Sequence, residues 1–195
     1  HHWKVETALC VAKKIAIELN IGSDILELAK FDYKVYKSVF LGSAGKKLTL
    51  SKTMPDDFTV VLPKQNPQLE ITRNGLFQKG DFLALYDMNQ IKNTDVYNAY
   101  PYDGFFSCNV GIIHNASAPE NKHILIIGDS FTRPVAAFLS LVCSDVERID
   151  LAGFDGSIRT FIEKNAMYDS IIVMYNPASI SVPDYSKHIS SFDFR

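Results

Sequence analysis

The sequence has little cysteine, no long apolar run and no cluster of basic residues. Its three cysteines are an odd number at scattered positions, which excludes a disulfide framework and a zinc pattern. We expect Cys10 and Cys143, which lie among apolar residues, to be inert core thiols. Its apolar runs, such as residues 124–127 and 171–175, are far too short to span a bilayer. Twenty basic against 22 acidic residues leave a formal charge of −2, so nucleic acid is not an expected partner. No metal and no cofactor are predicted.

The apolar content is high enough for one folded domain. Hydrophobic residues make up 47% of the 195 residues and charged residues 22%, which excludes global disorder. We therefore expect a single domain over residues 1–195. The chain begins His1-His2-Trp3 and not with a methionine, so we expect a further native segment ahead of it.

The first 80 residues predict a helix followed by a β-rich section. Apolar residues recur at spacings of three and four over residues 4–19, which indicates a helix with one apolar face. A second short helix is predicted over residues 25–29. Residues 31–79 then alternate in polarity, as strands do, and Asn74-Gly75 predicts a hairpin with a type I′ turn. We expect residues 81–103 to form a short helix and an irregular surface.

The second half of the chain alternates strands with helices. Strands are predicted over residues 110–114, 123–127, 147–151 and 170–175, and helices over residues 133–142 and 157–164. Such alternation predicts a parallel sheet that is covered by helices on both faces. The runs 124–127 and 171–174 are continuously apolar, as doubly buried parallel strands are. The predicted fold class is α/β, with a parallel, flavodoxin-like core and a β-rich insertion at about residues 31–79.

Gly128-Asp129-Ser130 stands between an apolar strand and an amphipathic helix. In an open α/β sheet, active sites form outside the carboxyl ends of the strands. Ser130 would lie there at a helix N-terminus, where the helix dipole favours an oxyanion. The alternative is that Asp129 or Ser130 is only the N-cap of the helix.

The next two predicted strands also end in residues that suit an oxyanion. Gly153 and Gly156 follow one strand, and such a loop brings a backbone N–H close to a ligand. Asn176 follows the other strand and has an amide that donates hydrogen bonds. Together with the Ser130 N–H, these groups would form an oxyanion hole. The alternative is that the glycines and the Asn-Pro pair simply form turns.

This order of strand, Gly-Asp-Ser, helix, glycine loop and strand-end asparagine resembles the SGNH/GDSL hydrolase superfamily. That superfamily needs a histidine base, usually in Asp-x-x-His near the C-terminus. Here the C-terminus has Asp184-Tyr185-Ser186-Lys187-His188, one residue longer than that pattern, which makes His188 a weak candidate. His114 and His123 are expected to be surface residues.

His1-His2-Trp3 provides a better candidate for the histidine base than His188 does. One branch of the superfamily, which includes the alginate O-acetyltransferases and the bacterial DHHW family, places Asp and His ahead of the serine in an Asp-x-His-Trp motif. The chain resembles the DHHW family over essentially its whole length. The matching segments are residues 1–3, 40–47, 57–59, 126–131 with Arg133-Pro134, 149–151 and 174–176.

Carried onto this sequence, the resemblance implies Ser130 as nucleophile and His2 as its base. Asn176 and Gly153 or Gly156 would complete the oxyanion hole. Arg133 and Trp3 are candidate substrate-binding residues, although Arg133 would equally serve to pair with a carboxylate of the protein. Two departures stand out. The motif's Asp would precede His1, so this exact chain is expected to be impaired, and the loop after Leu151 lacks the family's Arg and aromatic residue.

The resemblance implies a serine-dependent O-acyl esterase or O-acetyltransferase. Its substrate would be an acyl ester or carbohydrate outside the cytoplasm, in a secreted protein or one tethered to a membrane through the expected upstream segment. A second interpretation is a carbohydrate- or partner-binding module with a decayed serine site. A third is an assembly factor of the cell surface.

Overall fold

The computed structural model describes residues 2–48, 50, 52–151, 153–165 and 167–176. Eight strands and four α-helices are assigned within these residues. They follow in the order α1 (Val5–Glu18), β1 (Phe31–Phe40), β2 (Asp56–Pro63), β3 (Leu69–Arg73), β4 (Leu76–Gly80), α2 (Met88–Lys92), β5 (Val110–His114), β6 (Glu120–Gly128), α3 (Thr132–Leu139), β7 (Cys143–Asp150), α4 (Ile158–Asn165) and β8 (Ser170–Met174). Short 3₁₀ helices lie at Ser23–Leu26, Leu28–Lys30, Gly45–Lys47 and Phe82–Leu85. No helix among the described residues is both long and apolar enough to cross a membrane.

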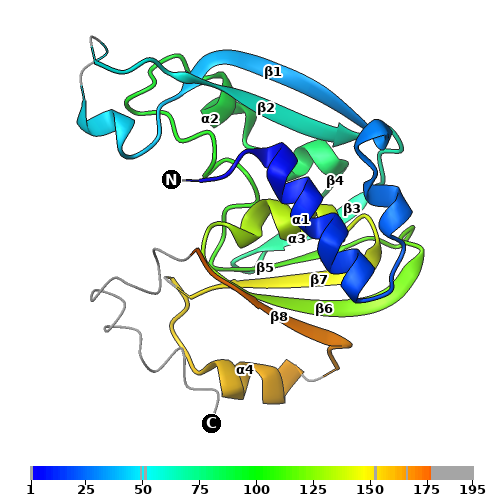
Figure 1. The fold of residues 1–195 in the computed structure, drawn as a ribbon. Coiled ribbons are helices and arrows are strands. Elements are labelled where there is room, and N and C mark those ends of the chain that lie inside the picture. Colours follow the sequence, from blue (N-terminus) through cyan, green and yellow to red (C-terminus); the bar gives the residue numbers. More distant parts are fainter. Residues whose placement is uncertain (1, 49, 51, 152, 166, 177–195) are drawn as a thin grey trace.

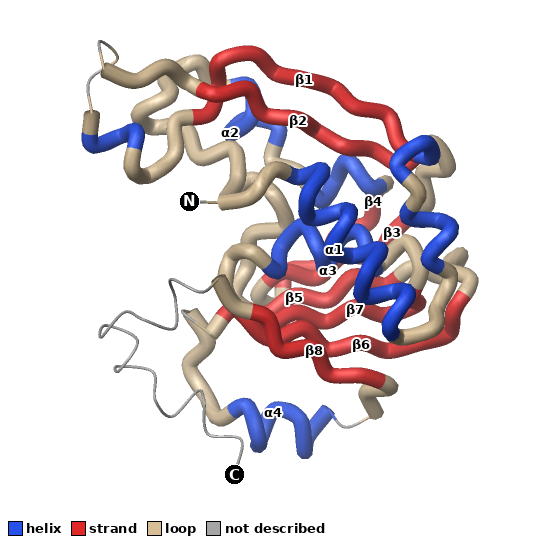
Figure 2. The backbone as a smooth tube through the Cα atoms, viewed as in Figure 1, coloured by secondary structure: helices blue, strands red, loops and turns tan. Residues whose placement is uncertain are grey.

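The strands form two separate sheets. Strands β1 and β2 pair antiparallel in a two-stranded sheet that arches over the rest of the molecule (Figure 1). The other six strands form one sheet in the order β4-β3-β5-β7-β6-β8. Helices α1 and α3 cover one face of this sheet, and α4 lies on the opposite face (Figure 2).

The large sheet is mixed, so the prediction of a parallel sheet was correct only for β7, β6 and β8. Strands β3, β4 and β5 run antiparallel to their neighbours. The reason is the length of the connections. A parallel crossover needs a dozen or more residues, whereas only residues 115–119 join β5 to β6 and a two-residue turn joins β3 to β4. The β-rich section is therefore divided, with β1 and β2 apart and β3 and β4 extending the main sheet.

The Asn74-Gly75 turn has the predicted conformation. Both residues have positive φ, 48° for Asn74 and 83° for Gly75, as a type I′ turn requires. The turn places Arg73 opposite Leu76 and so sets the register of the β3–β4 pair.

Alternate side chains of β6 enter two apolar cores. Ile124 and Ile126 face α1, α3 and the arching strands, whereas Leu125 and Ile127 face α4. This burial on both faces confirms the interpretation of β6. Strand β8 differs, because Ile171 and Val173 are 44% and 54% exposed at the edge of the described sheet.

Two further expectations need correction. Cys143 is buried as predicted, but Cys10 is exposed, because it lies on the outward face of α1, four residues before the exposed Lys14. The segment over residues 81–103 contains the predicted short helix, but it is not merely surface. Its side chains Phe82, Ile91 and Tyr102 are buried in the core.

The carboxyl ends of the three parallel strands meet at one edge of the sheet. Gly128, the last residue of β6, lies opposite Asp150 of β7 and Met174 of β8. A Cβ atom on Gly128 would lie 1.9 Å from the Met174 carbonyl oxygen and 2.6 Å from Thr132 Cγ2. Only glycine therefore allows β6 to approach β8 and α3 this closely just before Ser130.

We predict that Gly128→Ala lowers the free energy of unfolding by at least about 1–3 kcal/mol, because the added methyl group overpacks this junction. Denaturant unfolding followed by circular dichroism measures the loss. Gly22→Ala is the matched control, since its Cβ would meet no atom closer than 3.4 Å. An equal loss in the two variants would contradict the packing argument.

Candidate active site

Ser130 lies in the turn between β6 and α3, at the carboxyl edge of the sheet. The neighbouring Asp129 holds this turn: its Oδ1 accepts from the Phe131 N–H at 3.0 Å and its Oδ2 from the Asn176 N–H at 2.8 Å. The Thr132 hydroxyl in turn donates to the Asp129 carbonyl at 2.7 Å. Helix α3 has Phe131 as its N-cap, with no side-chain cap hydrogen bond, so neither Asp129 nor Ser130 is the N-cap considered for this motif. The Ser130 hydroxyl faces His2 in the N-terminal segment.

His2 is brought to Ser130 across 128 positions of sequence. The imidazole Nε2 lies 2.8 Å from the Ser130 Oγ. The ring stacks on Tyr102, with centroids 3.9 Å apart and planes 12° from parallel, and the Phe131 ring lies at 5.5 Å. Burial lowers the pKa of His2 to about 4. Nearby positive charge, Arg133 included, acts in the same direction, whereas the Asp103 carboxylate opposes it. His2 is therefore neutral near pH 7 and able to accept a proton.

Trp3 supports this histidine indirectly. Its indole N–H donates to the Tyr102 hydroxyl at 3.0 Å, and its ring lies 5.0 Å from that of Phe131. Trp3 is not among the described residues that line the cavity at Ser130. Trp3 contacts the aromatic ring on which His2 stacks, and its role in substrate binding stays a prediction.

A cavity of about 540 Å³ opens beside Ser130 and His2. Its walls come from the loop after β1, the segment around residue 100 and the carboxyl edge of the sheet. The described residues that line it are His2, Phe40, Leu41, Gly42, Ser43, Lys46, Ala99, Tyr100, Tyr102, Asp103, Asp129, Ser130, Arg133, Asp150 and Asn176.

The predicted oxyanion donors separate into two groups. Ser130 and Asn176 both line the cavity, but Gly153 and Gly156 are not among its described lining residues. The Gly153 N–H donates to the Asp150 carbonyl at 3.2 Å, so the turn itself uses it. A Cβ on Gly153 would lie 2.3 Å from Asn109 Oδ1, so this glycine provides room for a side chain of the protein.

Arg148 lies beneath the site and was not identified from the sequence. Its guanidinium is fully buried and donates to the Thr132 hydroxyl at 2.6 Å and to the Asp150 carboxylate at 2.7 Å. It also donates to the carbonyls of Cys108 and Asp129, at 2.7 and 3.2 Å. A charged residue next to the apolar Ile149, within the strand predicted over residues 147–151, was the available signal.

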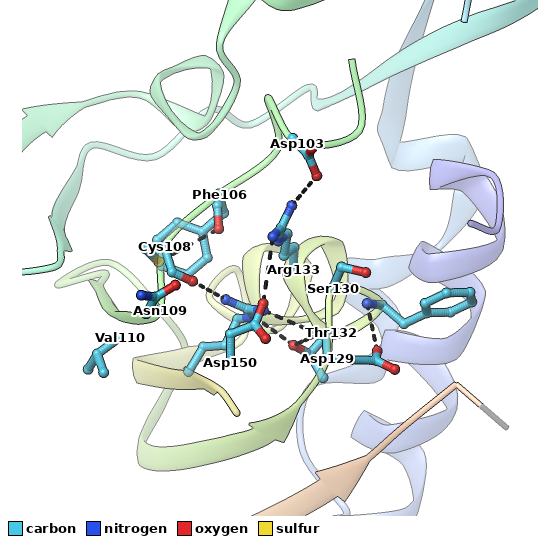
Figure 3. Close-up of polar contacts among 12 residues, drawn as sticks. Asp103, Phe106, Cys108, Asn109, Val110, Asp129, Ser130, Thr132, Arg133 and Asp150 are labelled. Atoms are coloured by element: carbon cyan, nitrogen blue, oxygen red, sulfur yellow. Dashed lines mark hydrogen bonds and ion pairs between the residues drawn. The ribbon is translucent and has the colours of Figure 1, made fainter. Parts of the chain in front are cut away.

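Arg133 projects from the first turn of α3 into the same network. One terminal nitrogen lies 2.6 Å from an Asp103 carboxylate oxygen, and the other lies 3.6 Å from Asp150 (Figure 3). Of the two roles considered for Arg133, the structure shows the pairing with carboxylates of the protein.

Two further histidines among the described residues have partners of their own. His114 bonds through Nδ1 to Asp145, and the His123 ring packs at a tilt against Tyr168, with centroids 4.5 Å apart. His188 falls outside the described residues. Within the part of the chain that is described, no group of three or more His, Cys, Asp or Glu residues is placed to hold a metal ion.

Neither a protein-family model nor a curated protein matches the sequence. Solved structures do match. A DHHW family protein from Eubacterium siraeum superposes with a TM-score of 0.69 at 17% identity, over 95% of this chain and 60% of that one. The chain is similar in fold to that DHHW family protein. Bacillus cereus PatB1 with a sulfonyl adduct gives 0.68 at 16% identity, over 93% of this chain and 60% of that one.

A second PatB1 structure gives a TM-score of 0.63 at 15% identity, over 93% of this chain and 62% of that one. This chain thus spans about 60% of the length of the chains it matches. The resemblance stated from the sequence is confirmed as a likeness of fold. It covers the mixed sheet and the arching strands together.

We predict that Arg148→Met lowers the free energy of unfolding by about 3–5 kcal/mol, because it leaves the buried Asp150 carboxylate without its closest cation. Thermal and denaturant unfolding measure the change. Arg159→Met serves as the control, because Arg159 forms an exposed pair with Glu163 one helical turn away and should change stability by only about 0.5 kcal/mol or less. Similar losses in the two variants would show that the buried network adds nothing.

The titration of His2 offers a direct test of the site's geometry. By NMR of the imidazole, we expect a pKa of about 4 for His2. In Tyr102→Ala this pKa should rise toward the ordinary 6.5, because removal of the stacked ring readmits water and favours the charged form. Tyr97→Ala, whose hydroxyl donates to the Leu48 carbonyl away from His2, should leave it unchanged. A His2 pKa near 6.5 in the parent chain would contradict the packing described here.

Proposed function

We propose that this protein is a serine-dependent O-acyl esterase or O-acetyltransferase that works through an acyl-serine intermediate. The observation that carries the proposal is the 2.8 Å contact between His2 Nε2 and Ser130 Oγ at the wall of a cavity. A hydroxyl within hydrogen-bond reach of a neutral imidazole is the arrangement that activates a serine nucleophile. The position of Ser130 at the carboxyl edge of the sheet agrees with it.

In the first half-reaction, His2 accepts the Ser130 proton while Oγ attacks the acyl carbonyl carbon. The carbonyl π electrons move to its oxygen, and the Ser130 N–H and the Asn176 side chain are the groups proposed to stabilise the negative charge. When the tetrahedral intermediate collapses, the bond to the alcohol oxygen breaks. His2 returns its proton to that oxygen, and the acyl group stays on Ser130.

In the second half-reaction, a new hydroxyl enters and His2 takes its proton. Attack on the acyl-serine and collapse of the second tetrahedral intermediate restore the Ser130 hydroxyl. Water as the acceptor makes the reaction a hydrolysis, and a sugar hydroxyl makes it a transfer.

The similar solved structures support the proposal. Attachment of a sulfonyl group requires a nucleophilic side chain, and the similar PatB1 was solved with a sulfonyl adduct. The resemblance to the DHHW family is the basis for proposing a carbohydrate of the cell envelope as substrate. It is also the basis for proposing that the protein acts outside the cytoplasm.

We predict that a fluorophosphonate labels Ser130 of the parent chain, and that Ser130→Ala abolishes the label. His2→Gln should slow labelling by at least about 10²-fold, because it removes the general base. Intact-protein mass spectrometry measures the rate, and peptide mapping locates the adduct. Ser107→Ala, at an exposed serine outside the cavity lining, should label like the parent chain.

The pH dependence of this labelling follows from the pKa of His2. The neutral imidazole is the active form, so the rate should hold down to about pH 5 and fall as the pH drops through about 4. Loss of labelling near pH 6.5 would contradict the buried, neutral histidine. No labelling of Ser130 at any pH would reject the proposed function in favour of a binding module with a decayed site.

A further inference from the structure

Arg133 lines the same cavity as Ser130, and two carboxylates of the protein flank it. Its side chain is 13% exposed. Asp103 lies 2.6 Å from one terminal nitrogen and is itself 51% exposed, whereas Asp150, at 3.6 Å from the other nitrogen, is 8% exposed. Asp150 also pairs with the buried Arg148 at 2.7 Å. Arg133 therefore lies between a buried carboxylate and one at the cavity surface.

The Asp103 carboxylate stands where an anionic part of a substrate would otherwise bind Arg133. Asp103 belongs to the protein, so it competes with free anions at an effective concentration on the order of millimolar. An anionic substrate would have to displace it or lie beside it in the cavity.

The other charges that line the cavity also disfavour an anionic substrate. Its described lining residues contain three carboxylates, Asp103, Asp129 and Asp150, and two cations, Arg133 and Lys46. The Lys46 ammonium donates to the Ala99 carbonyl at 2.7 Å. It also lies 3.2 Å from the centroid of the exposed Tyr100 ring. Lys46 thus contacts two groups of the protein on the wall that residues 95–103 provide.

We propose that Asp103 is a specificity-determining residue that occupies Arg133 and makes the site selective for esters without negative charge next to the reacting acyl group. This inference rests on the proposed function, since it names the substrate class of the same site. It distinguishes uncharged acylated sugars from acylated uronates and other anionic esters. In this view Arg133 is held by the protein and donates to uncharged oxygens of the substrate.

Two phenyl acetates of the same shape test the proposal: 4-acetoxybenzamide, which is neutral, and 4-acetoxybenzoate, which carries one negative charge. Values of kcat/KM are measured for each and divided by the rate of its uncatalysed hydrolysis. The parent chain should favour the neutral ester by about tenfold, because the charged ring meets like charge in a partly enclosed cavity. Added salt should reduce this preference, since the charges involved are partly exposed.

Asp103→Asn should shift the preference toward the anionic ester by about tenfold, because the substitution frees Arg133 and removes one negative charge. Asp57→Asn is the matched control. It removes the same charge from an ion pair of similar length, Lys37–Asp57 at 2.7 Å, on strand β2 away from the cavity, and it should keep the parental preference. Thermal unfolding of both variants verifies that they remain folded.

The outcomes separate this inference from the proposed function. Ser130-dependent turnover of the neutral ester tests the function alone. Equal or faster turnover of the anionic ester by the parent chain would overturn the role of Asp103 and leave the esterase intact. An unchanged preference in Asp103→Asn would do the same. Failure of both esters to react at Ser130 would overturn both proposals.

Discussion

The buried charge of Arg148 is the constraint on which the site depends. A guanidinium fully removed from water costs several kcal/mol unless its donors are paired. In this protein the partners are the Asp150 carboxylate, the Thr132 hydroxyl and two backbone carbonyls, of which one belongs to Asp129. These groups come from the ends of β6 and β7, the start of α3 and the segment before β5. Satisfying one charge therefore fixes the turn that presents Ser130.

The histidine reaches this turn because helices pack. The apolar face of α1 lies on the sheet beside α3, and the turn with Ser130 leads directly into α3. The residues just before α1 are thereby carried to the N-terminal end of α3, where His2 meets Ser130. The hydrogen bond from Trp3 to Tyr102 and the stacking of Tyr102 on His2 then orient the imidazole. Helix packing thus brings His2 close to Ser130, and these two contacts orient its ring.

Electrostatics at the cavity follow from the same network. Asp150 is shared by Arg148 and Arg133, and Arg133 connects it to Asp103 at the surface. The chain of alternating charges runs from the sheet interior to the cavity rim, so a change at Asp103 alters the surroundings of the buried pair. Asp129, by contrast, uses its carboxylate on two backbone N–H groups and shapes the turn.

The sequence by itself determined the order of elements, the type I′ turn, the doubly buried β6 and the pairing of Ser130 with His2 as candidates, because these depend on local periodicity, turn chemistry and a recognisable motif. It did not determine the direction of β5, the exposure of Cys10, the hydrogen-bond partner of the Gly153 N–H or the partners of Arg133 and Arg148. Those depend on which distant segments meet. Only the tertiary structure placed Asp103 against Arg133 and Tyr102 against His2, because ion pairs and ring stacking form between residues that no local pattern connects.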